Sequence, residues 1–169
     1  LADGMGGHRA GNIASEIAVT DLGAAWVDTQ IDSVNQVREW FAEHLEQENQ
    51  RIHQFGQDEE YKGMGTTLEA LAIIDNQAIY AHIGDSRIGL IRGEEYSQLT
   101  SDHSLVNALL KAGQITQEEA ERHPQKNIIT QSIGQKDEVQ PDYGMITLED
   151  GDYLLLNSDG LTNMISDSE

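Results

Sequence analysis

The stretch TLEALAIIDNQAIYAHIGDSRIGLIRG, residues 67–93, contains three short runs that are rich in apolar and β-branched residues. Turn-forming pairs follow the first and the last run, Asp75-Asn76 and Gly93-Glu94. Short runs of this composition, bounded by turn residues, are typical of β-strands. We therefore predict three strands, TLEALAII, QAIYAHIG and RIGLIRG, which form an antiparallel meander.

Two helical patterns precede these strands. NIASEIAVTDLGAAWV, residues 12–27, places apolar residues at roughly helical spacing and predicts a helix over about that range, capped near Gly11 or Asn12. DSVNQVREWFAEHLEQENQRIHQFG, residues 32–56, carries a clearer apolar face. We expect Ser33 to cap this second helix and Gly56 to end it.

Further helices and strands are predicted after residue 93. SLVNALLKAG and TQEEAERH indicate two short helices, with Gly113 as a stop and Thr116 as a cap. MITL and DYLLLNSDG indicate two more strands, joined at residues 149–151. Strands mixed with helix pairs favour a single α+β domain over residues 1–169. We expect the strands to pack as an antiparallel β-sandwich with helices outside.

Composition and charge exclude several classes of protein. The chain has 169 residues, of which 38% are hydrophobic, enough for one domain with a real core. Its 30 acidic and 10 basic residues give a net charge of −20, which repels nucleic acid. No run of residues is long and apolar enough for membrane insertion, and no signal-peptide pattern is present. The absence of cysteine excludes disulfides and thiolate metal sites, and is compatible with the cytoplasm.

Three aspartates share one sequence context. Asp3, Asp85 and Asp159 each lie at or just past the end of an apolar run, beside a glycine. A carboxylate at a strand end can point into a cleft while the strand holds it rigid, and hard cations need several such oxygen ligands. Gly4 can offer its backbone carbonyl in the same way. Aspartate beside glycine is also common in plain turns, so both interpretations stay open at this point.

Other functional motifs fit the sequence poorly. In GMGGHRAG the last glycine of a dinucleotide fingerprint would fall on Arg9, and no P-loop or G-x-S-x-G elbow occurs. DGDYLLLNSDG is not a calcium-binding EF-hand loop, because Leu154 stands where an oxygen ligand is needed. His44 and Glu48 are four residues apart on a predicted helix, and we assign them to a solvated face.

Six stretches, taken together and in order, resemble the bacterial type 2C metal-dependent protein Ser/Thr phosphatases. The resemblance covers nearly the whole chain and is strongest to enzymes of Gram-positive cocci that oppose a transmembrane Ser/Thr kinase. The stretches are ADGMGGHRAG, GMGTTL, HIGDSRIGLIR, TSDHSLVNALLKAGQIT, HPQKNIITQSIG and LLLNSDGLTNMI.

The resemblance implies a β-sandwich flanked by helices, with a cluster of Mn²⁺ or Mg²⁺ ions at one end. By position, Asp3 would bridge two core metal ions and the Gly4 carbonyl would bind one of them. Asp159 would bind the second core ion and a third, weaker one, and Asp85 would help to bind that third ion. The segment from about residue 104 to residue 126 would be a mobile flap beside the cleft.

The implied reaction is the hydrolysis of phosphoserine and phosphothreonine on proteins by a water that bridges two metal ions. No side chain is assigned as a catalytic group, and no cysteine nucleophile is needed. The implied partners are phosphorylated proteins, including a cognate Ser/Thr kinase, and the protein is expected to be a cytoplasmic monomer. The alternative is a non-catalytic module of the same fold that binds phosphoproteins or metal.

Several positions depart from the family pattern. Met5 stands where many relatives outside bacteria have a histidine proposed as a general acid, so that role is not carried over. We expect His103 to be structural, and Thr66 and Thr67 to support the site without binding metal. The family also has an N-terminal strand with a phosphate-binding arginine and a C-terminal Asp-Asn motif. Neither is found in residues 1–169, so we expect this chain to lack a core metal ligand and to be incomplete at both ends.

Overall fold

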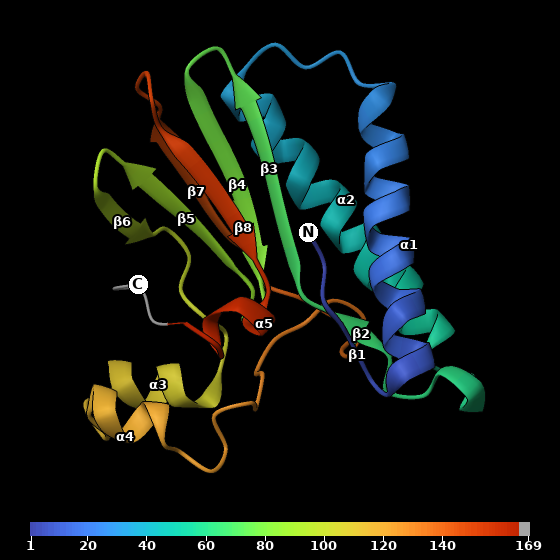
Figure 1. Cartoon of the computed structure of the whole chain (residues 1–169). Helices are drawn as coiled ribbons and strands as arrows, with labels where there is room; N and C mark the ends of the chain where they lie inside the picture. Colours follow the sequence, from blue (N-terminus) through green and yellow to red (C-terminus); the bar gives the residue numbers. More distant parts are fainter. Residues whose placement is uncertain (166–169) are drawn as a thin grey trace.

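The computed structural model describes residues 1–165, with only the backbone described at His8 and Arg9. In this part of the chain, two antiparallel three-stranded sheets form a β-sandwich, and a short two-stranded ribbon lies beside it (Figure 1). The expected α+β class is therefore confirmed. The elements in chain order are β1 (Gly4–Met5), α1 (His8–Val27), α2 (Val34–Phe55), η1 (Glu59–Tyr61), β2 (Gly65–Thr66), β3 (Leu68–Ile74), β4 (Gln77–Ile83), β5 (Arg87–Arg92), β6 (Glu95–Gln98), α3 (Leu105–Lys111), α4 (Gln117–Glu121), β7 (Asp142–Thr147), β8 (Tyr153–Asn157) and α5 (Asp159–Thr162).

The strand pairing corrects part of the predicted meander. β3 and β4 form the expected hairpin, in which Ile74 pairs with Gln77 across the turn at Asp75, whose φ is 54°. However, β5 does not pair with β4; it belongs to the second sheet, with the order β6-β5-β8, while the first sheet has the order β3-β4-β7. The chain changes sheet at Gly84, whose φ of 114° redirects the backbone between β4 and β5. Apolar periodicity identifies strands but not their partners, which is why the meander was wrong beyond β4.

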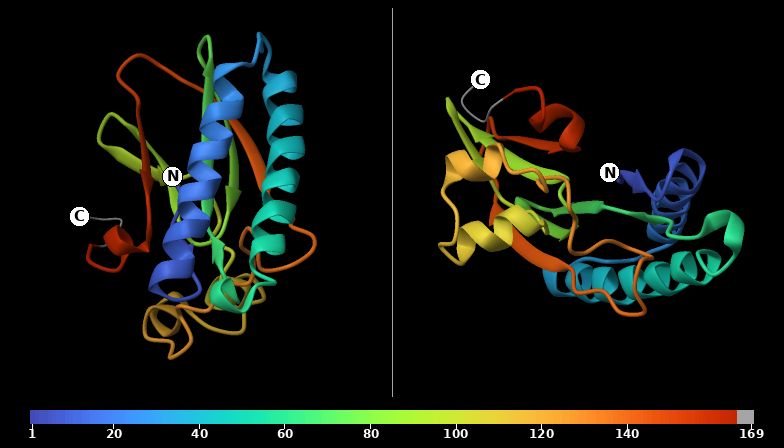
Figure 2. Two further views of the ribbon diagram at one scale, coloured as in Figure 1. Left: turned by 90° about the vertical axis from the view of Figure 1, so that its right-hand side faces the viewer. Right: turned by 90° about the horizontal axis from the view of Figure 1, so that it is seen from below.

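The two long helices cover one sheet. Figures 1 and 2 show α1 and α2 side by side against β3 and β4. In Figure 1, α3, α4 and α5 lie near the end of the sandwich at which β3 begins and β4 ends. Ala14 and Ala18 on α1 are fully buried, so this helix packs closely through small side chains. α2 contributes larger groups to the same core, including Phe41, Leu45 and Ile52. Among residues 1–165, no helix is both long and apolar enough to cross a membrane.

The glycine-rich start of the chain is explained by contact between backbones. A Cβ atom on Gly4 would lie 1.9 Å from the carbonyl oxygen of Gly11, so β1 and the first turn of α1 cross at a distance that only glycine permits. Gly6 and Gly7 adopt φ values of 108° and 92° at the turn between them. α1 therefore begins at His8, earlier than predicted, and Gly7 occupies the N-cap position without a side-chain cap.

Asn49 on α2 fixes the segment that leads from α4 to β7. Its fully buried side-chain amide donates to the carbonyl oxygens of Lys136 and Asp137, both at 3.0 Å. Its oxygen accepts a hydrogen bond of 2.8 Å from the backbone N–H of Gly134. One side chain thereby satisfies three buried or half-buried backbone groups in a segment that has no regular structure of its own.

We predict that Asn49→Ala lowers the free energy of unfolding by about 3 kcal/mol, because three hydrogen bonds of about 1 kcal/mol each are lost. Urea unfolding followed by circular dichroism measures this. The adjacent Gln50→Ala lies on the exposed face of the same helix and is the control, with an expected change within about 0.5 kcal/mol. Equal losses in the two variants would contradict the anchoring role of Asn49.

Glu48 is the exception to the expected solvated face of α2. Its side chain is buried, and its Oε2 has no hydrogen-bond partner among the described residues. Burial is the main cause that raises the pKa of Glu48 to about 7. The nearby charge of Asp21 on α1 also raises this pKa, whereas the charge of Arg51 lowers it. Arg51 pairs with Asp21 across the two helices. The sequence assignment of Glu48 to solvent was therefore wrong, because this helix buries a wider face than its apolar stripe indicates.

We predict that Glu48→Gln stabilises the protein more at pH 8 than at pH 5. A raised carboxyl pKa favours the folded state below the unfolded value of 4.5, and this contribution is lost as the pH rises towards 7. The difference in unfolding free energy between the two pH values should be about 1–2 kcal/mol, since solvent near the helix surface screens part of the effect. Urea titrations at both pH values measure it. The exposed Glu39→Gln on the same helix should show no such difference.

Candidate metal centre

The three predicted aspartates lie at the ends of strands, carried by segments that are far apart in the sequence. Asp3 directly precedes β1, Asp85 lies in the turn between β4 and β5, and Asp159 begins α5 just after β8. All three are only partly exposed. Asp85 and Asp159 are therefore carried by the ends of sandwich strands, and Asp3 by the segment that leads into the two-stranded ribbon.

Electrostatics show that these carboxyl groups are close to one another. Burial raises the pKa of Asp3, and the charge of Asp159 and a hydrogen bond between the two side chains raise it further. The pKa of Asp85 is raised to about 6, mainly by burial. The charges of Asp159, Asp102 and Asp3 raise it in the same direction. The charge of Asp159 thus disfavours the ionised forms of both Asp3 and Asp85, as expected when carboxylates share a site.

The donor set fits a hard cation, although the side chains alone do not enclose one. Within residues 1–165, no three histidine, aspartate or glutamate side chains are arranged so that they could hold a metal ion. Asp3 and Asp159 interact directly, and Asp85 is within electrostatic reach. Further oxygen ligands must come from backbone carbonyls, water or substrate, which is usual for Mg²⁺. A bound cation would relieve the repulsion that raises these pKa values.

The backbone of Asp3 is fixed by two threonines. Its carbonyl oxygen accepts hydrogen bonds from the backbone N–H of Thr67 at 2.9 Å and from the hydroxyl of Thr66 at 3.1 Å. Its N–H donates to the Thr67 hydroxyl at 3.0 Å. Both threonines are fully buried. Their arrangement agrees with the expectation that they support the site, because both contact the backbone of Asp3.

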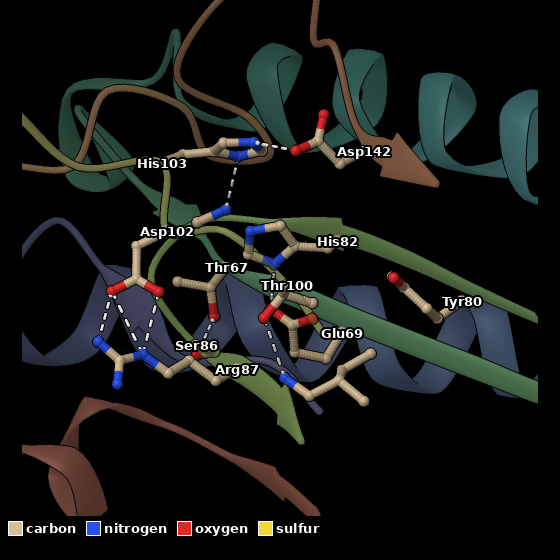
Figure 3. Close-up of polar contacts among 12 residues, drawn as sticks. Thr67, Glu69, Tyr80, His82, Ser86, Arg87, Thr100, Asp102, His103 and Asp142 are labelled. Carbon is tan, nitrogen blue, oxygen red and sulfur yellow. Dashed lines mark hydrogen bonds and ion pairs between the residues drawn. The ribbon is translucent and has the colours of Figure 1, made fainter. Parts of the chain in front are cut away.

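His103 holds the turn that carries Asp85. The backbone N–H of Gly84 donates to Nδ1 of His103 at 3.2 Å, and the N–H of His103 donates to the Gly84 carbonyl at 2.7 Å (Figure 3). Because Nδ1 accepts, the proton belongs on Nε2, which lies 3.2 Å from a carboxylate oxygen of Asp142. Burial, and next the charge of His82, lower the pKa of His103 and favour this neutral form. These contacts support the structural role expected for His103.

A buried Glu69–His82 pair lies behind this turn. His82 Nδ1 is 2.7 Å from Glu69, and its Nε2 is 3.1 Å from the Ser101 carbonyl. Burial raises the pKa of Glu69 to about 7. Burial opposes the charged form of His82, but the hydrogen bond and charge of Glu69 outweigh it and raise the pKa of His82. Sequence analysis missed this pair, although the two-residue turn after Ile74 sets the register that places Glu69 opposite His82.

The helices after His103 begin as predicted. Ser104 caps α3 through the N–H of Asn107, and Thr116 forms a capping box with Glu119 at the start of α4. The segment of residues 104–126 contains both helices and continues directly from the residues that hold Gly84 (Figure 1). Its connection to the candidate site is therefore through the Ser101–His103 backbone.

Arg87, two residues after Asp85, forms a two-pronged ion pair. Its Nε and terminal nitrogen donate to the Asp102 carboxylate at 3.0 and 2.8 Å, and the side chains are mostly buried. We predict that Arg87→Lys lowers the free energy of unfolding by about 1.5 kcal/mol, because lysine cannot make both contacts. Urea unfolding measures the loss.

Arg122→Lys is the control for this substitution, because Arg122 makes an exposed ion pair with Glu118 four residues earlier in the sequence. Its expected effect is within about 0.5 kcal/mol. If both arginine variants had the same stability as the wild type, the ion pair at Arg87 would not be what holds the Ser101–His103 segment against β5.

Comparison with known proteins identifies the family. The protein phosphatase 2C family matches residues 1–169. Protein phosphatase PhpP of Streptococcus pneumoniae (strain D39) is 86% identical over 169 residues, which are all of this chain and 69% of that protein. The S. agalactiae serine/threonine phosphatase superposes with a TM-score of 0.96 at 62% identity, over 99% of this chain and 69% of that one.

A third relative bears on the metal. The catalytic domain of the serine/threonine protein phosphatase PstP, described in complex with two manganese ions, superposes with a TM-score of 0.84 at 35% identity. The match covers 98% of this chain and 68% of that one. With a family match over its full length and relatives this similar, the chain belongs to the protein phosphatase 2C family of metal-dependent protein serine/threonine phosphatases.

Proposed function

We propose that Asp3, Gly4, Asp85 and Asp159 form the metal centre through which this phosphatase hydrolyses phosphoserine and phosphothreonine. The observation that supports this most directly is the side-chain hydrogen bond between Asp3 and Asp159, together with the position of Asp85 within reach of the charges of both. Folding brings them together at an electrostatic cost, which a bound divalent cation would offset. Such a cost is uncommon at positions that serve only as turns.

The proposed assignment is the one that the family resemblance implies. Asp3, the Gly4 carbonyl and Asp159 would hold two core ions, and Asp85 and Asp159 would hold a third, weaker one. The ions would be Mn²⁺ or Mg²⁺. Bound metal supplies a water of lowered pKa and offsets the charge of the phosphate on this acidic protein. The chain's own contribution is to fix these oxygens, through the threonines that bind the Asp3 backbone and the His103 contacts to Gly84.

The proposed substrates are phosphorylated proteins in the cytoplasm, including a cognate Ser/Thr kinase, and the active form is a monomer. We propose that residues 104–126 act as a flap beside the site, since they continue from the segment that contacts the Asp85 turn. The second candidate is a non-catalytic module that binds metal or phosphoprotein. It is favoured by the finding that, in residues 1–165, no three acidic or histidine side chains could hold an ion.

We predict that Asp3→Asn and Asp159→Asn each reduce Mn²⁺-dependent turnover by at least about 100-fold, because each removes a charged metal ligand. Hydrolysis of p-nitrophenyl phosphate and of a phosphothreonine peptide is measured with Mn²⁺, with Mg²⁺ and with EDTA, which should abolish turnover. Asp150→Asn, in the exposed turn before β8, is the matched control and should leave activity unchanged.

Binding is measured separately from turnover, by the electron paramagnetic resonance signal of free Mn²⁺. The assays use the 169-residue chain, and also this chain joined to the parts of the S. pneumoniae relative that lie outside the match. Turnover that persists in EDTA, or in both aspartate variants, would contradict the metal role. Folded protein that binds Mn²⁺ but hydrolyses neither substrate in either form would favour the binding module.

A further inference from the structure

A single buried hydroxyl group lies between two of the proposed metal ligands. The Thr67 Oγ1 accepts a hydrogen bond of 3.0 Å from the N–H of Asp3. It also lies 2.8 Å from the hydroxyl oxygen of Ser86 (Figure 3). Ser86 directly follows Asp85 in the turn between β4 and β5. Thr67 and Ser86 are both fully buried, so solvent does not compete for these hydrogen bonds.

The hydrogen-bonding capacity of these groups suits a fixed link. A hydroxyl has one proton and two acceptor sites. The Thr67 oxygen accepts from Asp3, and it can still either donate its own proton to Ser86 or accept the proton of Ser86. The backbone of Asp3 and the turn of Asp85 are therefore joined through a continuous chain of two hydroxyl groups.

The rest of Thr67 contacts the same two segments. Its backbone N–H donates to the Asp3 carbonyl at 2.9 Å, which fixes Asp3 from a second direction. Its methyl group packs against Gly84, where an added Cβ would lie 2.5 Å from the Thr67 Cγ2. Thr67 thus contacts the residue before Asp85 through its methyl group and the residue after it through its hydroxyl.

We propose that Thr67 is a positioning residue whose hydroxyl sets the placement of the Asp85 turn relative to Asp3. This inference rests on the proposed function, because it assigns a role in metal binding to the spacing of two proposed ligands. The carboxyl groups that share a site repel each other, so their spacing has to be imposed by the backbone that carries them. Loss of the Thr67 hydroxyl leaves the Asp3 N–H and the Ser86 hydroxyl without this partner. Asp3 and the Asp85 turn are then linked only by the backbone and methyl contacts of Thr67.

The first test is the isosteric substitution Thr67→Val. We expect the affinity for Mn²⁺ per folded molecule to fall roughly tenfold, the usual scale for one buried hydrogen bond. Thr100→Val is the matched control. Thr100 is also buried and accepts from a backbone N–H, that of Ile88 at 3.1 Å, but it has no hydrogen bond to the acidic turns. Thr100→Val should lower thermal stability to a similar extent without changing Mn²⁺ affinity.

Two further variants separate the hydroxyl from the methyl group. Thr67→Ser keeps the hydroxyl and should restore most of the Mn²⁺ affinity that Thr67→Val loses. Ser86→Ala removes only the far end of the link and should weaken Mn²⁺ binding as Thr67→Val does. The double variant should be no weaker than the weaker single variant, because both changes break the same link. A serine variant as weak as the valine variant would overturn the role of the hydroxyl.

A metal-free measurement makes the test independent of the proposed function. In EDTA, hydrogen exchange at the amides of residues 84–86 should be faster in both Thr67→Val and Ser86→Ala than in Thr100→Val. The amide of Asp3 should be exposed in Thr67→Val but remain protected in Ser86→Ala. Unchanged exchange in the turn would overturn the coupling, whatever the metal results. If the variants show this exchange pattern but the wild-type protein binds no Mn²⁺, the coupling stands and the proposed metal centre is wrong.

Discussion

The proximity of three partly buried carboxyl groups is the constraint on which the rest of the structure depends. Burial, and then the charge of Asp159, raise the pKa values of Asp3 and Asp85, so folding must hold together groups that repel each other when ionised. Hydrophobic packing of α1 and α2 on the first sheet supplies the stability for this. The local arrangement is then set by hydrogen bonds to backbone atoms, which do not depend on the ionisation of the aspartates themselves.

These hydrogen bonds converge on short segments instead of on the carboxyl groups. Thr66 and Thr67 bind the backbone of Asp3, and His103 binds both the N–H and the carbonyl of Gly84. The Asp3 and Asp159 side chains hydrogen bond to each other, and Asn163 donates to one Asp159 oxygen at 3.1 Å, so the remaining carboxylate oxygens are available for a ligand. A carboxylate that binds a cation is commonly held by a further hydrogen bond of this kind, which fixes its orientation.

Much of the fold and part of the site could be predicted from the sequence. Helical spacing placed the ends of α2 correctly at Ser33 and Gly56, although the Ser33 side chain makes no capping hydrogen bond. The turn pair at Asp75 predicted the β3–β4 hairpin. The position of β5 could not be predicted, because its apolar pattern is satisfied by either sheet. The acidic turns were recognisable as strand ends beside glycines, whereas the groups that hold them were not. Their partners lie far away in the chain, and only the three-dimensional pairing shows that Glu69 faces His82 or that Asn49 binds residues 134–137.

The pairing of β5 with β8 has a consequence for how the protein acquires its activity. The β3–β4 hairpin pairs residues that are close in the sequence. In contrast, β8 pairs Asn157 with Arg87, which is far earlier in the sequence, and this pairing brings Asp159 towards Asp3 and Asp85. Contacts between residues so distant in sequence form late in folding, because closing the intervening loop costs entropy before the contact is gained. During synthesis on the ribosome, the hairpin and both long helices can therefore assemble first. The acidic groups of the proposed centre come together only after β8 docks, so a partly made chain has the scaffold before it has the site.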